Sequence, residues 1–176
     1  LDDGRELIDG TSSWWTAAHG YNHPHIRACV AAQLERMPHV MLGGLAHEPA
    51  VTLATRLAKL LPGDLGHTFF SESGSVSVEI AMKMAVQYWI NKGEKGRTRF
   101  KGAMAEQLIC DLPTTPERAE AFDAFLKAHK HEVAAVLTEP LVQGAGGMIF
   151  HDTATLKTLR DICDKHGVLL ILDEIF

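Results

Sequence analysis

Apolar residues recur at helical spacing along much of this chain and form unbroken runs in two places. The helical spacing predicts amphipathic helices over residues 24–37, 48–61, 116–129 and 155–166. The unbroken runs at 134–137, within a predicted strand 133–138, and at 168–172 are typical of strands that are buried on both faces. Strands that alternate with helices predict an α/β fold, with a mainly parallel sheet covered by helices on both faces.

The segment 67–89 carries the clearest local signal. A short apolar run at 67–70 predicts a buried strand, a turn of small polar residues follows, and a helix then begins with Ser73 or Ser75 as its cap. Unpaired N–H groups and the positive end of the helix dipole favour anions at such a start. A phosphate could therefore bind against Gly74 and Ser75. An ordinary turn before a core helix explains the same residues equally well.

The helix that follows is apolar on almost all sides. Its polar stripe consists of Glu79, Lys83 and Gln87, and a helix of this kind is buried in a large core or in a subunit interface. Glu79 precedes Lys83 by four residues, the orientation that favours an ion pair on a helix. We therefore interpret Lys83 as a paired surface lysine and not as a nucleophile.

The first residues combine a predicted hairpin with an unusual aromatic loop. Asp3 and Gly4 predict a turn, with a returning strand at 6–9. Trp14 and Trp15 follow in a loop of Ser and Thr. Two adjacent indoles cannot both be buried in a small loop without a wall to pack against, so we expect them to line a pocket or a subunit interface. Burial of both in the core is the alternative.

Bulk properties narrow the class of protein. The 176 residues suffice for one domain with a sizeable core. A net charge of −5 gives no electrostatic case for binding nucleic acid or an anionic membrane, and no apolar run is long enough to span a bilayer. Three scattered cysteines indicate a reducing compartment, and we expect a cytoplasmic protein.

Two carboxylates follow directly after predicted strands. Asp173 comes after the run 168–172, and Glu139 after the run 133–138. In parallel sheets ligands collect at the carboxyl ends of the strands. A carboxylate at the edge of an apolar core costs several kcal/mol unless it is paired, and a protonated pyridine nitrogen is one suitable partner. Without a cofactor in mind, a capping role for Asp173 is the simpler interpretation.

The histidines His19, His23 and His25 raise the alternative of a metal site. Pro24 interrupts them, no cysteine lies within the cluster, and no i, i+4 spacing holds across all three. We interpret them as loop histidines.

Several motifs together resemble the class III pyridoxal-phosphate aminotransferases of fold type I. They are the Ser-Gly-Ser turn at 73–75, the Asp173 that follows Leu-Leu-Ile-Leu, and Glu-Pro-Leu-Val-Gln-Gly-Ala-Gly-Gly at 139–147. Within that family, the motifs at 9–15, 20–24 and 39–44 are similar to those of members that pass an amino group from S-adenosylmethionine to 8-amino-7-oxononanoate in biotin biosynthesis.

The resemblance implies an enzyme with pyridoxal 5'-phosphate as its cofactor and small molecules as its substrates. Gly74 and Ser75 would hold the cofactor phosphate, and Asp173 would pair with the pyridinium nitrogen. Trp14 would contact the substrate, and Glu139 would lie near the ring. The resemblance also implies a homodimer with active sites at the interface, in agreement with a helix that is apolar all round.

The resemblance further implies how the chain is organised. Residues 1–66 would form an N-terminal segment with the substrate loop, and residues 67–176 would form part of the large cofactor-binding domain. The catalytic lysine of the family lies beyond the Asp173 strand, in sequence that these 176 residues do not include. A Gly-Tyr-His-Gly-Asp-Thr stretch is also missing where Phe100 meets Lys101, so we expect a gap at 100/101.

Two rivals remain beside this interpretation. The protein could be another class III aminotransferase that uses an ω-amine, although the pair Trp14 and Trp15 argues against it. It could also be an interaction protein without catalytic activity, if the lysine is missing from the whole protein.

Overall fold

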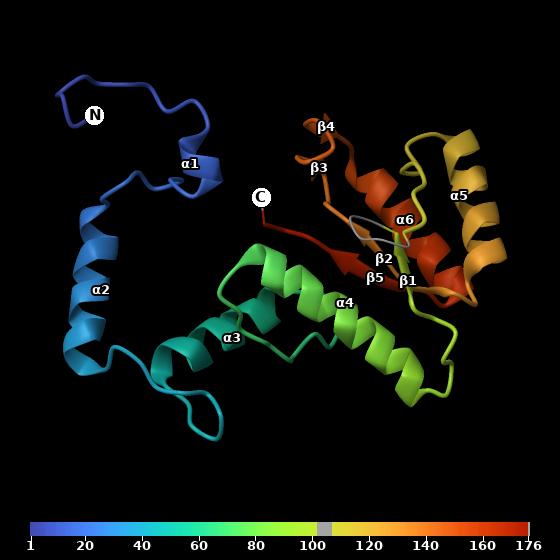
Figure 1. Ribbon diagram of the computed structural model, residues 1–176, viewed down its shortest axis with the longest axis horizontal. Coiled ribbons are helices and arrows are strands. Elements are labelled where there is room, and N and C mark those ends of the chain that lie inside the picture. The colour runs from blue at the N-terminus through green and yellow to red at the C-terminus, as the bar shows by residue number, and fades with distance from the viewer. Residues whose placement is uncertain (102–106, 176) are drawn as a thin grey trace. The chain divides into compact units, whose positions relative to one another are not determined.

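The chain forms two compact units in a computed structural model, Leu1–Phe69 and Phe70–Phe176. The structure describes residues 1–101 and 107–175. Figure 1 follows the elements from the N-terminus to the C-terminus. Each unit is described by itself.

The first unit contains the two helices that the apolar spacing predicts. They are α2 (Pro24–Arg36) and α3 (Glu48–Leu60), and each has a proline in its first turn, where the missing N–H is no loss. Arg36 and Glu48 link the helices through an ion pair of 2.8 Å. No residue of α2 or α3 is buried. The unit therefore has no hydrophobic core of its own.

The hairpin predicted for the first ten residues is wrong. The turn forms, with the N–H of Gly4 donating to the carbonyl of Leu1 at 3.1 Å, but residues 5–9 form no strand. Ile8 is 99% exposed. An extended segment becomes a strand only where another strand satisfies its backbone groups, and a single hairpin is marginal in water.

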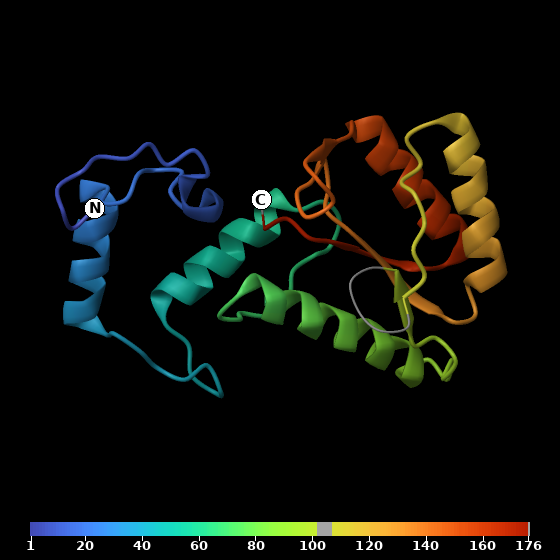
Figure 2. The same cartoon turned by 45° about the horizontal axis from the view of Figure 1, so that its top comes forward.

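A three-stranded parallel sheet lies at the centre of the second unit. Its strands are ordered β1 (Arg99–Lys101), β2 (Val133–Thr138) and β5 (Leu169–Leu172). Helix α4 (Gly74–Asn91) covers one face, and α5 (Pro116–His129) and α6 (Thr153–His166) cover the other (Figure 2). The predicted α/β fold with a parallel sheet and helices on both faces is confirmed.

Strand β2 lies in the middle of this sheet and is its most buried element. The side chains of Val133 to Val136 are fully buried, which explains why this strand is an unbroken apolar run. The core between the sheet and the helices α5 and α6 consists of Phe122, Leu126, Val133, Val136, Leu159, Ile162, Cys163 and Val168.

Helix caps form where the sequence places capping residues. Thr115 accepts from the N–H of Arg118 at the start of α5, and Asp152 accepts from the N–H of Thr155 at the start of α6. Gly167 ends α6 in the left-handed conformation, with φ of +61°, which glycine adopts readily.

Helix α4 packs on the sheet with one face only. Met82, Ala85 and Trp89 are buried, and the indole N–H of Trp89 donates to the carbonyl of Ala134 at 2.7 Å. On other sides Met84 is 58% exposed and Tyr88 43%. The all-round apolar character therefore does not bury the helix within the described residues.

The short strand predicted at 67–70 is wrong. Residues 67–70 form no strand, because no described segment pairs with them, and Phe69 is 68% exposed. Further along the chain, β3 (Val142–Gln143) and β4 (Ile149–Phe150) form a small antiparallel hairpin. Strand β1 continues through Lys101, whereas Gly102 lies outside the described residues.

None of the helices in the described ranges is long and apolar enough to cross a membrane.

Candidate active site

The N-terminus of α4 has the features of an anion-binding site. Ser73 is its cap and accepts from the N–H of Val76 at 3.3 Å, which settles the choice between Ser73 and Ser75. Among the described residues, no acceptor is found for the N–H groups of Gly74 and Ser75, the first two residues of the helix. These donors and the helix dipole both favour negative charge at this point.

Glu139 and Asp173 lie side by side at the carboxyl edge of the sheet. Strands β2 and β5 run parallel with Thr138 opposite Leu172, so the next residue on each strand is one of the two carboxylates. The N–H of Asp173 donates to the carbonyl of Thr138 at 2.9 Å and extends the strand pairing. The Asp173 carboxylate accepts from the N–H of Ile175 at 3.2 Å.

A contact between Gly74 and Ile175 connects the sheet edge to the helix start. A Cβ atom at Gly74 would lie 2.2 Å from Cδ1 of Ile175, so only glycine fits without a shift of that side chain. Ile175 is two residues after Asp173. The structure thereby brings the segment of Asp173 to Gly74 and Ser75, although the strand expected to lead into this helix is absent.

The tryptophan loop of the first unit is a short turn with left-handed backbone. Its residues form α1 (Ser12–Trp15), and their φ angles lie between +49° and +63°. Such a conformation costs roughly 1–2 kcal/mol per non-glycine residue. Trp14 is 79% exposed and Trp15 44%, and their rings meet edge to face at 5.8 Å. Neither ring is buried within the first unit.

Asp9 organises this turn. Its Oδ1 accepts from the N–H and the hydroxyl of Thr11, at 3.1 and 3.0 Å. Its Oδ2 accepts from the N–H and the hydroxyl of Ser13, at 2.6 and 3.2 Å, and from the hydroxyl of Tyr21. Partial desolvation acts to raise the pKa of Asp9, but the hydrogen bonds from Thr11 and Ser13 outweigh it and lower that pKa below 3.8.

Asp9 is the residue that sequence-based prediction missed. A signal was present, because an Asp followed at two and four residues by Thr and Ser is suited to local side-chain bonds to the backbone. Ile175 was missed as well, and its contact with Gly74 has no local signal. Trp14 belongs to the first unit, whereas Gly74, Ser75 and Asp173 belong to the second.

Other candidate groups have local roles. Lys83 pairs with Glu79 at 2.6 Å, which confirms the predicted surface pair, and this bond lowers the pKa of Glu79. The rings of His19 and His23 meet edge to face at 6.3 Å. In the residues that the structure describes, no cluster of three or more potential metal ligands is found.

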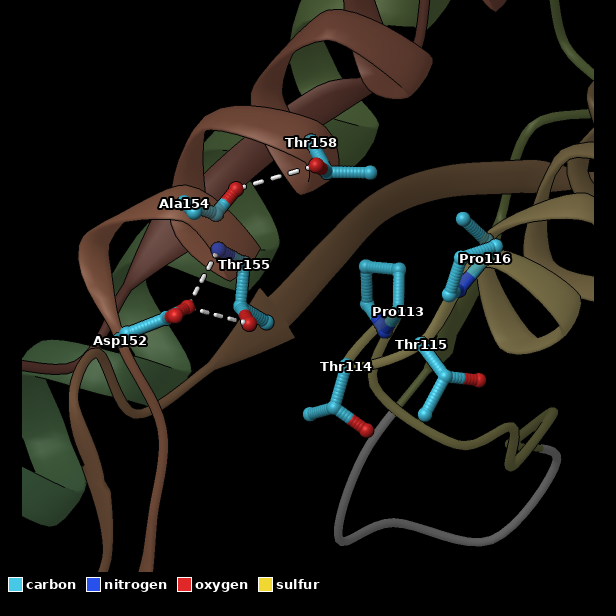
Figure 3. A pocket seen from close by; sticks show the side chains of 9 residues that line it. Pro113, Thr114, Thr115, Pro116, Asp152, Ala154, Thr155 and Thr158 are labelled. Atoms are coloured by element: carbon cyan, nitrogen blue, oxygen red, sulfur yellow. Dashed lines mark hydrogen bonds between the residues drawn. The ribbon is translucent and has the colours of Figure 1, made fainter.

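A hollow of about 250 Å³ lies where α5 and α6 begin (Figure 3). Its polar groups largely satisfy one another, since Asp152 accepts from both the N–H and the hydroxyl of Thr155 at 2.8 Å. The candidate cofactor and substrate residues do not line it. Its lining is Pro113, Thr114, Thr115, Pro116, Ala119, Asp152, Ala154, Thr155 and Thr158.

Comparison with known proteins assigns the chain to a family. The sequence pattern of the family described as aminotransferase class-III matches residues 1–109 and 105–176. The chain belongs to the class III aminotransferases.

Individual members of this family are similar over nearly the whole chain. The adenosylmethionine-8-amino-7-oxononanoate aminotransferase of Mycobacterium leprae is 43% identical over 99% of this chain and 48% of the relative. The solved structure of the enzyme with the same name from Methanocaldococcus jannaschii has 27% identity and a TM-score of 0.86, over 98% of this chain and 46% of that one. The predicted fold type I of class III aminotransferases is confirmed.

A solved amine transaminase is also similar. The transaminase comes from an uncultivated Pseudomonas species, and its structure was determined in the PLP-bound form. It has 30% identity and a TM-score of 0.83, over 98% of this chain and 49% of that one. The chain spans about half the length of the curated class III relatives that it matches.

Proposed function

We propose that the complete protein binds pyridoxal 5'-phosphate and transfers an amino group from S-adenosylmethionine to 8-amino-7-oxononanoate, a step in biotin biosynthesis. The observation that carries this proposal is the convergence of the α4 N-terminus and the Asp173 segment at the contact of Gly74 with Ile175. The 43% identity to the Mycobacterium leprae relative supports the choice of substrates.

The residues at this convergence fit the cofactor. Gly74 and Ser75 offer backbone N–H groups to a phosphate, and the space that a side chain of Gly74 would take is filled by the Ile175 side chain. The neighbouring Ile175 side chain is 62% exposed and therefore has room to rotate. Asp173, at the end of β5, supplies a negative charge that would keep the pyridine nitrogen protonated.

The bound cofactor would supply a positively charged ring that stabilises negative charge on the substrate carbon. Asp173 would maintain that ring charge through an ion pair, and the helix start would fix the position of the phosphate. Glu139, the neighbour of Asp173 at the sheet edge, would lie near the ring. Trp14, which is 79% exposed, would contact the substrate.

We further propose a cytoplasmic homodimer. The apolar side chains of Met84, Tyr88 and Ile90 are all more than 40% exposed on α4, and apolar surface of this kind is commonly covered by a partner subunit.

Product analysis tests the reaction. The complete protein is incubated with pyridoxal 5'-phosphate, 8-amino-7-oxononanoate and S-adenosylmethionine, and the diamine product is measured by mass spectrometry. We expect product that depends on both substrates. A matched reaction replaces S-adenosylmethionine with a simple ω-amine. Product from the ω-amine alone would favour the second candidate function, that of an amine transaminase, which the similarity to the Pseudomonas enzyme supports. The absence of amino transfer from every donor would contradict the proposal.

A further inference from the structure

The left-handed turn Ser12–Trp15 needs a specific cause, because its residues are not glycines. Ser12, Ser13, Trp14 and Trp15 all have positive φ angles. At roughly 1–2 kcal/mol each, this backbone would not persist without compensating bonds. Hydrogen bonds within the turn supply part of this compensation, such as the N–H of Trp15 donating to the carbonyl of Thr11 at 3.0 Å.

The Asp9 carboxylate provides the other bonds. It accepts from the N–H and the hydroxyl of Thr11 and from the N–H and the hydroxyl of Ser13, the residues on either side of Ser12. The Tyr21 hydroxyl donates to the same carboxylate and lies 3.0 Å from the Ser13 hydroxyl, so the far end of the loop is tied to the same point. Only an ionised carboxylate can accept from this many donors at once.

The turn determines where the indoles point. Trp14 follows Ser13 directly and is 79% exposed, with no wall of the first unit to fix its orientation. Its position therefore depends on the backbone of the turn and on the edge-to-face contact with Trp15. A group that fixes the backbone at Ser13 fixes the direction of the Trp14 side chain.

We infer that Asp9 is a positioning residue for substrate binding, which acts by holding the turn that presents Trp14. This inference rests on the proposed function, in which Trp14 contacts the substrate. Asp9 itself touches Thr11, Ser13 and Tyr21, and its effect on the substrate is transmitted through the backbone of the turn.

The test compares Asp9→Asn with Asp3→Asn in the complete protein. Asparagine keeps the size of the side chain, but it replaces one carboxylate oxygen, an acceptor, with an NH₂ group, a donor. This NH₂ group would face the donors of the turn. Asp3 is the matched control, because its carboxylate binds only the N–H and side chain of Arg5 among the described residues. We expect the KM for 8-amino-7-oxononanoate to rise about tenfold in Asp9→Asn, or about 1.4 kcal/mol, with kcat within about threefold of the parent. Asp3→Asn should resemble the parent protein.

A double-mutant cycle with Trp14→Ala shows whether Asp9 acts through Trp14. If it does, Asp9→Asn should change KM less than twofold in the Trp14→Ala background. The inference would be overturned if the effects of the two substitutions on KM multiply in the double variant. It would also be overturned if either Asp9→Asn or Trp14→Ala leaves KM unchanged.

Hydrogen exchange in the cofactor-free protein gives a readout that does not need activity. Asp9→Asn should speed the exchange of residues 11–21 at least severalfold at short labelling times, and Asp3→Asn should not. If the parent protein transfers no amino group, the proposed function fails, yet faster exchange in Asp9→Asn would still support the role of Asp9 in the turn. Unchanged exchange would overturn that role whether or not the parent is active.

Discussion

At the scale of single residues, Asp173 and Gly74 carry the proposed cofactor site by different means. Asp173 contributes a charge at the end of a strand of the parallel sheet, whereas Gly74 contributes the absence of a side chain at a helix start. A charge can be removed without a change of shape, and a methyl group can be added without a change of charge. The two contributions can therefore be tested separately.

Asp173→Asn should abolish amino transfer while the fold is retained. A neutral amide cannot balance the positive charge of the pyridine nitrogen, so we expect the rate to fall by at least about a hundredfold, or about 2.7 kcal/mol in the barrier. The rate is measured on the complete protein, with circular dichroism as the check on folding. Asp161→Asn removes an exposed surface carboxylate that pairs with Lys157, and its activity should be that of the parent. Near-normal activity of Asp173→Asn would remove Asp173 from the cofactor site.

Gly74→Ala should weaken cofactor binding by about tenfold or more, or about 1.4 kcal/mol. The new methyl group stands at the helix start where the phosphate would approach, and it also meets Ile175. Binding is measured by titration of the complete protein with pyridoxal 5'-phosphate.

A second substitution separates the two effects of Gly74→Ala. If the methyl group obstructs the phosphate, Gly74→Ala/Ile175→Ala stays weak, and full recovery of binding would show that only the clash with Ile175 matters. Gly66→Ala adds a methyl group in ordinary contact, 3.8 Å from the nearest neighbour, and serves as the control.

At the scale of elements, a carboxylate on α5 joins this helix to the end of α6. Asp123 accepts from Lys165 at 2.9 Å and from His166 at 2.9 Å. The hydrogen bond from Lys165, with that from His166, lowers the pKa of Asp123 below its ordinary value of 3.8. The group thus contributes stability that is complete above about pH 4 and is lost as the pH falls through the folded-state pKa.

Asp123→Asn should therefore lower the free energy of unfolding at pH 6 by about 1 kcal/mol. The difference between variant and parent should shrink as the pH falls below about 4, because the parent then loses the same charge. Urea unfolding of the complete protein at several pH values measures both effects. Asp161→Asn, which removes an exposed pair within α6, should change stability much less. A difference that grows toward acid pH would contradict this assignment.

At the scale of the whole molecule, the comparison with relatives bears on the expected gap at 100/101. The alignment with the Mycobacterium leprae relative runs over 208 residues, 32 more than the 176 residues of this chain. The family pattern also matches the chain in two pieces, 1–109 and 105–176. Both observations support the proposal that residues of the complete protein are missing from this part of the chain, although the two matched pieces meet at 105–109 and not at 100/101.

Peptide mapping tests that proposal directly. Cleavage after glutamate would release residues 95–106 as one peptide if Phe100 and Lys101 were joined. We expect this peptide to be absent from a digest of the natural protein and larger peptides to carry each half. Its detection in stoichiometric amount, or an intact mass near 19.3 kDa, would contradict the gap.

The sequence alone determined most of the helices and the strands β2 and β5. Residues 24–36 and 116–129 are helical as predicted, because apolar spacing and an initial proline act within a few residues, with the Thr115 cap in addition at 116–129. The run at β2 is a buried strand, as its apolar character predicts. The run at β5 is also a strand, but the prediction that it is buried on both faces is wrong for the described residues, since Leu169–Ile171 are half-buried and Leu172 is exposed.

Tertiary structure decided which partners these elements pack against. The segment 67–70 is predicted to be a strand, yet it has no partner among the described residues and forms none. The approach of Ile175 to Gly74 spans about a hundred residues of chain and depends on how α4 packs on β2 through Trp89. The left-handed turn depends on Tyr21 and Asp9 meeting across twelve residues. Periodicity and caps describe neighbours along the chain, whereas partners in space are fixed by packing, which no local pattern encodes.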